Sequence, residues 1–158
     1  MEGMGREVCT EHAMKYIGDN NEGAAEKWAR SRLGLKQAPD VFKALSAVNF
    51  NNEFTCVVLL TNFTKRNIDL NIAGDRGWAT PKLTLDLFNG VFSTIFNKLG
   101  AVRATALISE DNVLSQRFVK HLGFTDEGRM RKAYEDDKDM LIFGLLKEEY
   151  MSHDWCRS

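Results

Sequence analysis

A glycine-bearing loop at residues 74–81 has the composition of an anion-binding loop. It reads G-D-R-G-W-A-T-P and joins an expected strand at residues 67–73 to an expected helix. Thr80 suits the N-cap of that helix and Pro81 its first position. Backbone N–H groups at a helix start have no intrahelical partner, and the helix dipole favours negative charge there. Many such corners carry glycines only for geometry, so the loop taken alone is a weak signal.

The strand before this loop carries polar side chains on one face. Asp69 and Asn71 alternate with three aliphatic residues, which is the period of a strand. One face therefore belongs to a core, and the other presents a carboxylate and an amide. That polar face either meets solvent, as most such faces do, or lines a cleft.

A third stretch, residues 111–124, reads D-N-V-L-S-Q-R-F-V-K-H-L-G-F. Leu114, Phe118 and Leu122 recur at every fourth position, which predicts one apolar face of a helix. Gly123 follows, where a helix commonly ends through a left-handed cap. On these grounds alone the stretch is an amphipathic helix between two strands.

The same stretch resembles a family signature. Its pattern N-x-x-S-x-R-F-V-x-x-L-G-F closely resembles the second signature block of the GNAT N-acetyltransferases, and most of all their ribosomal-protein acetyltransferase branch. The resemblance extends from about residue 48 to about residue 149. The loop matches the family's pyrophosphate pattern Q/R-x-x-G-x-G/A at Gly77 and Ala79, whereas Gly74 stands where the family has Gln or Arg. Arg76 would either supply part of the missing charge to the phosphate or be an ordinary solvated arginine. The compact chain also resembles acetyltransferase-like proteins of phages.

The resemblance implies an α/β (α+β) fold in a single domain spanning residues 1–158. A mixed, mostly antiparallel central sheet of about six to seven strands would carry helices on both faces. In that fold the strand expected at residues 101–108 splays away from the strand that contains Asp69, and the pantetheine arm of acetyl-CoA lies in the gap.

The resemblance further implies which residues hold acetyl-CoA, the cofactor of this family. Backbone N–H groups around Ile72 and Ala73 would polarise the thioester carbonyl. Asn112 would bond the pantetheine arm, or only cap its helix. Arg117 would lie near the 3′-phosphate, or only in water. The expected cofactor-binding residues are Ile72, Ala73, Gly74, Arg76, Gly77, Trp78, Ala79, Thr80, Asn112, Ser115 and Arg117.

The implied reaction is direct transfer of an acetyl group, without an acyl-enzyme, to a primary amine of a protein N-terminus, a lysine or a small molecule. Many relatives place a proton-donating tyrosine where this chain has Val119, whereas the ribosomal-protein branch has a serine at the position of Ser115. Ser115 is therefore the candidate acid for the leaving thiolate, with Tyr134 as a weaker substitute. Asp69 is the candidate base, provided that burial raises its pKa from the ordinary value of about 4.

A second hypothesis is that the chain keeps this fold as a catalytically inactive binding or structural module, for instance of a phage. Gly74 and Val119 support it, because both depart from the family's motifs. Asn112, Gly77 and the helix start after the loop match those motifs, which favours the enzyme.

Composition argues against several other classes of protein. The 158 residues are 44% hydrophobic and 27% charged, which suits one soluble domain with a real core. A formal net charge of −1 argues against a nucleic-acid partner, and no apolar run is long enough to span a membrane. The three cysteines have no C-x-x-C spacing, which indicates reduced thiols in a cytoplasmic setting and no metal site.

The remaining elements must position these groups. We expect helices at residues 24–33 and 81–99, a strand at residues 54–60 and a turn at Asn51-Asn52. The second helix would bury Leu87, Phe88, Val91, Phe92, Ile95 and Leu99. A terminal hairpin follows, with Gly128 at a bend. Its basic cluster of Arg129, Arg131 and Lys132 is either solvated or contacts an acceptor carboxylate or the cofactor. Its last apolar strand offers an edge for a homodimer, which this family often forms.

Overall fold

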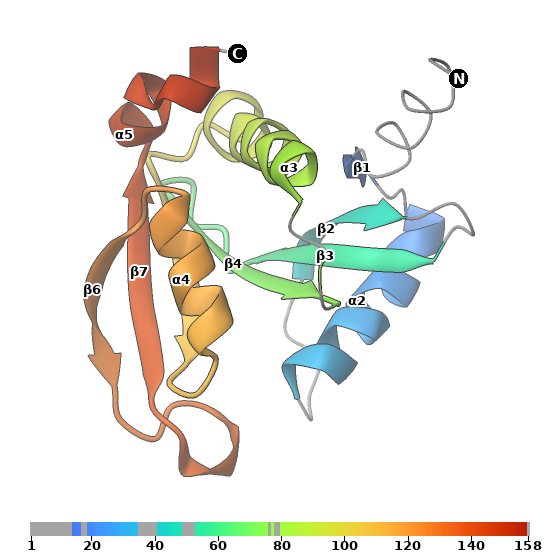
Figure 1. The fold of residues 1–158 in the computed structure, drawn as a ribbon, viewed down its shortest axis with the longest axis vertical. Coiled ribbons are helices and arrows are strands. Elements are labelled where there is room, and N and C mark those ends of the chain that lie inside the picture. Colours follow the sequence, from blue (N-terminus) through green and yellow to red (C-terminus); the bar gives the residue numbers. More distant parts are fainter. Residues whose placement is uncertain are drawn as a thin grey trace.

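Seven strands form one mixed sheet in the computed structural model, which describes residues 14–16, 19–34, 41–48, 53–75, 77 and 80–157. Their order across the sheet is β1-β2-β3-β4-β5-β7-β6 (Figure 1). The strands are β1 (Met14–Tyr16), β2 (Val41–Val48), β3 (Phe54–Thr61), β4 (Asn67–Gly74), β5 (Arg103–Ser109), β6 (Thr125–Met130) and β7 (Met140–Leu146). Every neighbouring pair is antiparallel except β4 and β5, which are parallel. The mixed, mostly antiparallel sheet expected from the sequence is confirmed.

Helices cover both faces of this sheet. Helix α2 (Asp19–Leu33) packs on one face, where Ala25 and Ala29 are buried against β2, β3 and β4. Helices α3 (Pro81–Ser93), α4 (Val113–His121) and α5 (Lys147–Ser152) contribute to the larger apolar core on the other face (Figure 1). Because β3 is buried on both faces, its sequence F-T-C-V-V-L-L-T is nearly continuously apolar.

Helix α3 begins at the residue that the sequence predicts, but its last turn does not have the predicted α-helical form. Its first intrahelical bond joins the Thr84 N–H to the Thr80 carbonyl at 2.8 Å, so the helix starts directly after Thr80. We expected an α-helix to Leu99, but a π-helical turn, Thr94–Lys98, ends it. Three consecutive residues at the start of that turn are buried. The expected stripe is buried at Phe88, Val91, Phe92 and Ile95, and partly buried at Leu99.

The C-terminal residues complete the core over α3. Strands β6 and β7 form the predicted hairpin, and its register shifts at Gly128. Tyr150 of α5 is 3% exposed, and its ring lies 5.1 Å from that of Phe88. Trp155 meets the same phenylalanine ring edge-on at 5.4 Å. Tyr150 and Trp155 therefore fold back onto the core over α3.

Several expected features lie outside the described residues. They are the turn at Asn51-Asn52, the loop residues Arg76, Trp78 and Ala79, and the side chain of Leu87. Among the helices that are described, none has the length and apolar character needed to cross a membrane.

Candidate active site

The two parallel strands at the centre of the sheet diverge. Strands β4 and β5 pair from Asn67 opposite Arg103 to Leu70 opposite Ala106. Beyond that point β4 continues beside β3 as far as Gly74, while β5 continues beside β7. A strand points its backbone N–H and C=O groups alternately towards its two neighbours. Past Leu70, the groups of β4 that face β5 therefore have no ladder partner among the described residues. The splay implied by the resemblance is confirmed.

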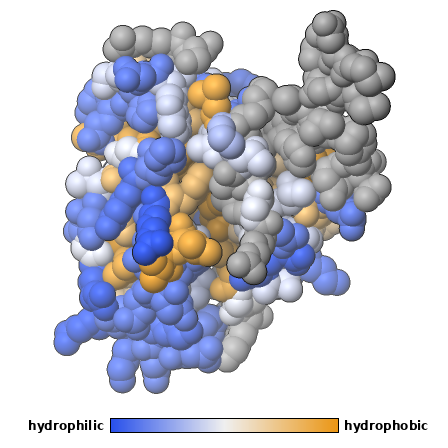
Figure 2. All heavy atoms as spheres, in the orientation of Figure 1, coloured by the Kyte–Doolittle hydropathy of each residue, from blue (hydrophilic) through white to orange (hydrophobic). Residues whose placement is uncertain are grey.

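A pocket of about 960 Å³ opens between the diverging strands. Its walls are the ends of β4 and β5, the first turns of α4, the last turn of α2 and the loop between β6 and β7. Figure 2 shows apolar side chains gathered around α4 beside a hollow in this face of the molecule. The pocket thus combines an apolar side with exposed backbone groups, as a site for a long, mostly apolar ligand arm requires.

Six of the expected cofactor-binding residues line this pocket. They are Ile72, Ala73, Gly74, Gly77, Asn112 and Ser115. Thr80 lies at the start of α3 and Arg117 is exposed on α4, and neither lines the pocket. Arg76, Trp78 and Ala79 lie outside the described residues. Residues that are far apart in the sequence, at the end of β4 and at the start of α4, therefore meet at one site.

Asn112 caps helix α4 and so positions Ser115. Its side-chain Oδ1 accepts the Ser115 backbone N–H at 3.2 Å. The Gln116 side-chain amide donates to the carbonyls of Ser109 and Glu110, at 3.2 and 3.0 Å. These bonds join the first turn of α4 to the end of β5, so the Ser115 side chain is held at the wall of the pocket.

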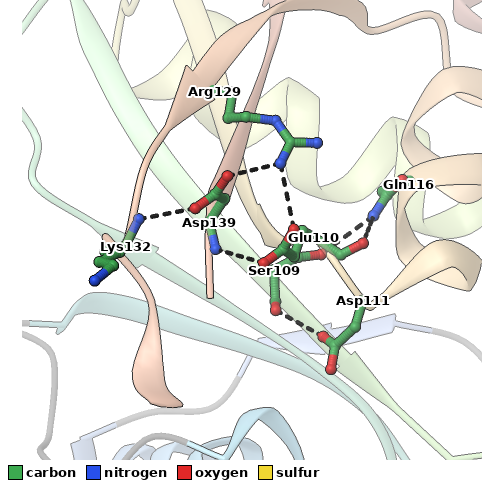
Figure 3. Close-up of polar contacts among 7 residues, drawn as sticks. All are labelled: Ser109, Glu110, Asp111, Gln116, Arg129, Lys132 and Asp139. Atoms are coloured by element: carbon green, nitrogen blue, oxygen red, sulfur yellow. Dashed lines mark hydrogen bonds and ion pairs between the residues drawn. The ribbon is translucent and has the colours of Figure 1, made fainter. Parts of the chain in front are cut away.

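A polar network connects this helix start to the β6–β7 hairpin (Figure 3). Arg129 lies between two carboxylates, 2.7 Å from Asp139 and 3.3 Å from Glu110. Glu110 in turn accepts the Asp139 backbone N–H at 2.9 Å, and Asp139 accepts the Lys132 N–H at 2.9 Å. The sequence left Arg129 as a solvated residue or a ligand contact, whereas the structure pairs it with the protein's own carboxylates.

The ion pairs of this network predict an acid-dependent stability. The Lys132 N–H and then the Arg129 guanidinium hold the pKa of Asp139 below its ordinary value. A depressed pKa adds stability that is complete above the unfolded pKa of about 4 and is lost as the pH falls through the folded value. Asp139→Asn should therefore destabilise the protein near neutral pH, and the difference should shrink on acidification below about pH 4. Urea unfolding at a series of pH values measures this difference.

Asp137→Asn is the matched control, because Asp137 is exposed and takes no part in the network of Figure 3. A destabilisation by Asp139→Asn that stays constant down to pH 3 would show that the ionised carboxylate is not its source.

Asp69 lies outside the pocket. Its carboxylate accepts hydrogen bonds from the side-chain amides of Asn62 and Asn67, at 3.2 and 2.9 Å. It stands opposite Thr105, in the part of β4 that still pairs with β5, and strand alternation turns it away from the face of Leu70. The expectation that this carboxylate faces the cleft is corrected: Asp69 belongs to a polar network on the paired part of the sheet.

Tyr134 joins the β6–β7 loop to the end of α2 at the pocket wall, a contact that sequence reasoning did not foresee. Its hydroxyl donates to the carbonyl of Leu33 at 2.9 Å, and both residues line the pocket. Burial, followed by the negative charges of Asp111 and Glu135, raises the pKa of Tyr134. The tyrosine therefore stays protonated at neutral pH. The two residues are 101 positions apart, so no local pattern could have paired them.

Leu114 differs from its expected place in the core. It was predicted on the same apolar face as Phe118 and Leu122, of which Leu122 is fully buried and Phe118 partly. Leu114 is instead 78% exposed and lines the pocket. The apolar face of α4 therefore extends past the core and becomes a wall of the site.

No protein-family model matches this chain, and no curated protein does. Solved structures do share its fold. Spermidine N-acetyltransferase from Vibrio cholerae, in complex with CoA and spermine, superposes with a TM-score of 0.68 over 90% of this chain and 99% of that one, at 11% identity. A GNAT-family acetyltransferase from Bacillus anthracis gives a TM-score of 0.56 over 67% of each chain, at 14% identity.

A protein assigned as a phosphinothricin N-acetyltransferase is also similar, with a TM-score of 0.64 over 85% of this chain and 97% of that one, at 14% identity. At these low identities the likeness establishes the fold. The chain has the α/β fold of the GNAT acetyltransferases, built on a mixed sheet.

Proposed function

We propose that this protein is an N-acetyltransferase that transfers the acetyl group of acetyl-CoA directly to a primary amine. The observation that carries the proposal is the divergence of β4 and β5 after Leu70 and Ala106, which opens a pocket beside the starts of α3 and α4. Structures with this fold support it, since one of them holds CoA and spermine. The string N-x-x-S-x-R-F-V supports the ribosomal-protein-like branch, and the free thiols of Cys56 and Cys156 support a cytoplasmic setting.

The residues present fit the phosphates of acetyl-CoA. Gly77 has a φ of +79°, and a Cβ built on it would meet no heavy atom within 4 Å. Open space thus adjoins a backbone turn just before the start of α3, where N–H groups lack intrahelical partners. Gly77 and the first turn of α3 would hold the pyrophosphate, and the gap between β4 and β5 would take the pantetheine arm.

The chemistry requires a neutral amine to attack the thioester carbonyl. The new N–C bond forms, the C–S bond breaks, the amine loses a proton, and the CoA thiolate gains one. Backbone N–H groups of Ile72 and Ala73 would stabilise the negative charge that develops on the carbonyl oxygen. Ser115 would donate a hydrogen bond to the sulfur, since Val119 has no proton to give. Because Asp69 is outside the pocket, water is the simplest carrier of the amine proton.

Calorimetric titration with acetyl-CoA, with 3′-dephospho-CoA for comparison, tests the cofactor site. We expect micromolar binding that weakens without the 3′-phosphate. Release of the CoA thiol on addition of an amine then tests the transfer. Absence of acetyl-CoA binding would overturn the proposal, and binding without transfer to any amine would identify an inactive module of the same fold.

Two substitutions at Asn112 separate its capping role from a role in binding. Asn112→Asp keeps an oxygen that can cap the Ser115 N–H but loses the amide donor, whereas Asn112→Ala loses both. If the amide bonds the pantetheine arm, both variants should weaken acetyl-CoA binding by about tenfold. Only Asn112→Ala should lose stability, by about 1 kcal/mol. Titration calorimetry and urea unfolding measure the two effects. Unchanged binding in Asn112→Asp would restrict Asn112 to the cap.

A further inference from the structure

We infer that a polar cluster, formed by the side chains of Asn67, Arg103 and Thr105, positions the two strands between which acetyl-CoA would bind. The cluster joins β4 to β5 directly before the strands diverge. Its members line no part of the pocket, so they are positioning residues that act through the strands. The inference rests on the proposed acetyl transfer and adds to it the groups that set the geometry of the gap.

The parallel pairing that precedes the gap is short. It consists of four pairs, from Asn67 opposite Arg103 to Leu70 opposite Ala106. Beyond the last pair, β4 is bonded to β3 and β5 to β7, and the two strands share no further ladder bond. The position of one wall of the gap relative to the other therefore depends on this short paired stretch.

Three hydrogen bonds join the side chains of the polar cluster. The Thr105 hydroxyl donates to Asn67 Oδ1 at 2.6 Å. Arg103 Nε donates to the same oxygen at 3.2 Å and to Thr105 Oγ1 at 3.1 Å. The Asn67 amide nitrogen donates in turn to Asp69 at 2.9 Å, which fixes the orientation of the amide. Because Thr105 is only 8% exposed, these bonds are partly shielded from water and reinforce one another.

The two faces of the paired stretch are held in different ways. On one face, its aliphatic side chains belong to the larger apolar core; they are Ile68, Leu70, Ala104 and Ala106. On the other face, the apolar cluster under α2 contains residues of β2, β3 and β4, but none from the described residues of β5. Polar side chains join β4 to β5 there instead. Because hydrogen bonds require particular partners and directions, they specify one register and one spacing of the strands.

The polar cluster is also joined to the β6–β7 hairpin. The Arg103 guanidinium lies 2.6 Å from the carboxylate of Glu127 on β6. A Cβ built on Gly144 of β7 would come closer than 3.0 Å to both of these charged groups. The φ of Gly144 is not left-handed, so this glycine leaves room for the ion pair and is not needed for a turn. The cluster thus links β4, β5 and β6 across β7.

A change in the polar cluster would move the groups that face the gap. The backbone N–H of Ile72 would help to polarise the thioester carbonyl, and Ile72 lies two residues beyond the last pair, about 7 Å along β4. A rotation of β4 against β5 by about 8° at that pair would displace this N–H by about 1 Å. Ser115 would move with β5, which leads into α4. A misplacement of about 1 Å can cost an enzyme about a hundredfold in rate.

Thr105→Val tests the inference, because it removes the hydroxyl and nearly keeps the shape of the side chain. We expect kcat to fall by about tenfold, since one of the three bonds between the strands and their side chains remains. Thr105→Ser keeps the hydroxyl and should retain most of the turnover. Steady-state release of the CoA thiol measures kcat. Unchanged kcat in Thr105→Val would overturn the inference.

Adenosine 3′,5′-bisphosphate separates positioning of the gap from a general loss of structure. It resembles the nucleotide end of acetyl-CoA and lacks the pantetheine arm, so it would not enter the gap. Thr105→Val should weaken the binding of acetyl-CoA by about fivefold and leave the binding of the bisphosphate unchanged. Calorimetric titration measures both affinities. Equal weakening of both ligands would assign the cluster a structural role only and overturn the inference.

Thr94→Val is the matched control. Thr94 is 2% exposed, and its hydroxyl donates to the Gly90 carbonyl at 2.9 Å, but it does not line the pocket and lies in the turn after α3. It should shift the midpoint of urea unfolding by an amount similar to that of Thr105→Val and leave kcat unchanged. An equal loss of kcat in both variants would overturn the inference.

The unaltered protein separates failure of this inference from failure of the proposed function. If it does not bind acetyl-CoA, both are overturned. If it binds acetyl-CoA and transfers the acetyl group, and Thr105→Val does so equally well, only the positioning role of the polar cluster is overturned.

Discussion

Gly77→Val should abolish acetyl-CoA binding, with a loss of affinity of about a hundredfold or more. Gly77 lines the pocket at a φ of +79°, and its missing side chain leaves open space beside the backbone. A valine would fill the space that a pyrophosphate needs, and its branched Cβ would strain the left-handed backbone by roughly 1–2 kcal/mol. Both effects act on the turn whose N–H groups would meet the phosphate oxygens. Titration calorimetry with acetyl-CoA measures the loss.

Gly100→Val is the matched control. Gly100 also has a left-handed φ, of +73°, and also has no heavy atom within 4 Å of a built Cβ, but it does not line the pocket. It should lose a similar amount of stability in urea unfolding and keep its affinity for acetyl-CoA. Normal acetyl-CoA binding by Gly77→Val would mean that the phosphates bind elsewhere.

Ser115→Ala should lower kcat by about ten- to a hundredfold while sparing acetyl-CoA binding. Ser115 lies at the pocket wall, where the cap from Asn112 fixes its backbone, and the buried Val119 one turn later can donate no proton. A serine hydroxyl is a weak acid, so its part is a hydrogen bond to the sulfur as negative charge develops there. Steady-state release of the CoA thiol gives kcat, and calorimetry gives the affinity.

Ser115→Thr is the conservative variant for this position. It keeps the hydroxyl and should retain more turnover than alanine, which a purely structural role for the serine would not explain. Unchanged kcat in Ser115→Ala would remove Ser115 from the mechanism and make Tyr134, which also lines the pocket, the next candidate acid.

Local patterns in the sequence were enough to predict most elements and their ends. The alternation in residues 67–73 predicted β4, which runs from Asn67 to Gly74. Thr80 and Pro81 predicted the start of α3, and Gly123 follows the end of α4 closely. Such signals are local because they arise from backbone preferences and from the period of burial. They failed where packing prevailed, as in the π-helical turn at Thr94–Lys98.

The family resemblance allowed part of the candidate site to be predicted from the sequence. Gly77, Asn112 and Ser115 were named from motifs, and the fold places all three at one pocket. Motifs could name them because each role depends on a residue type at a fixed place in one segment, such as a glycine in a left-handed turn. Their meeting depends on the pairing of β4 with β5, which joins segments about thirty to forty residues apart.

Only the tertiary structure decided which side chains face the pocket and which face away. Asp69 and Leu70 are neighbours in the chain, yet one bonds to two asparagines and the other lines the pocket. Tyr134 became a wall of the site through one hydrogen bond to Leu33, far away in sequence. The divergence of the strands sets these orientations, and it results from the packing of whole layers. No local spacing of residues predicts this divergence. The sequence therefore predicted the chemistry of the cleft, whereas its shape became known only from the tertiary structure.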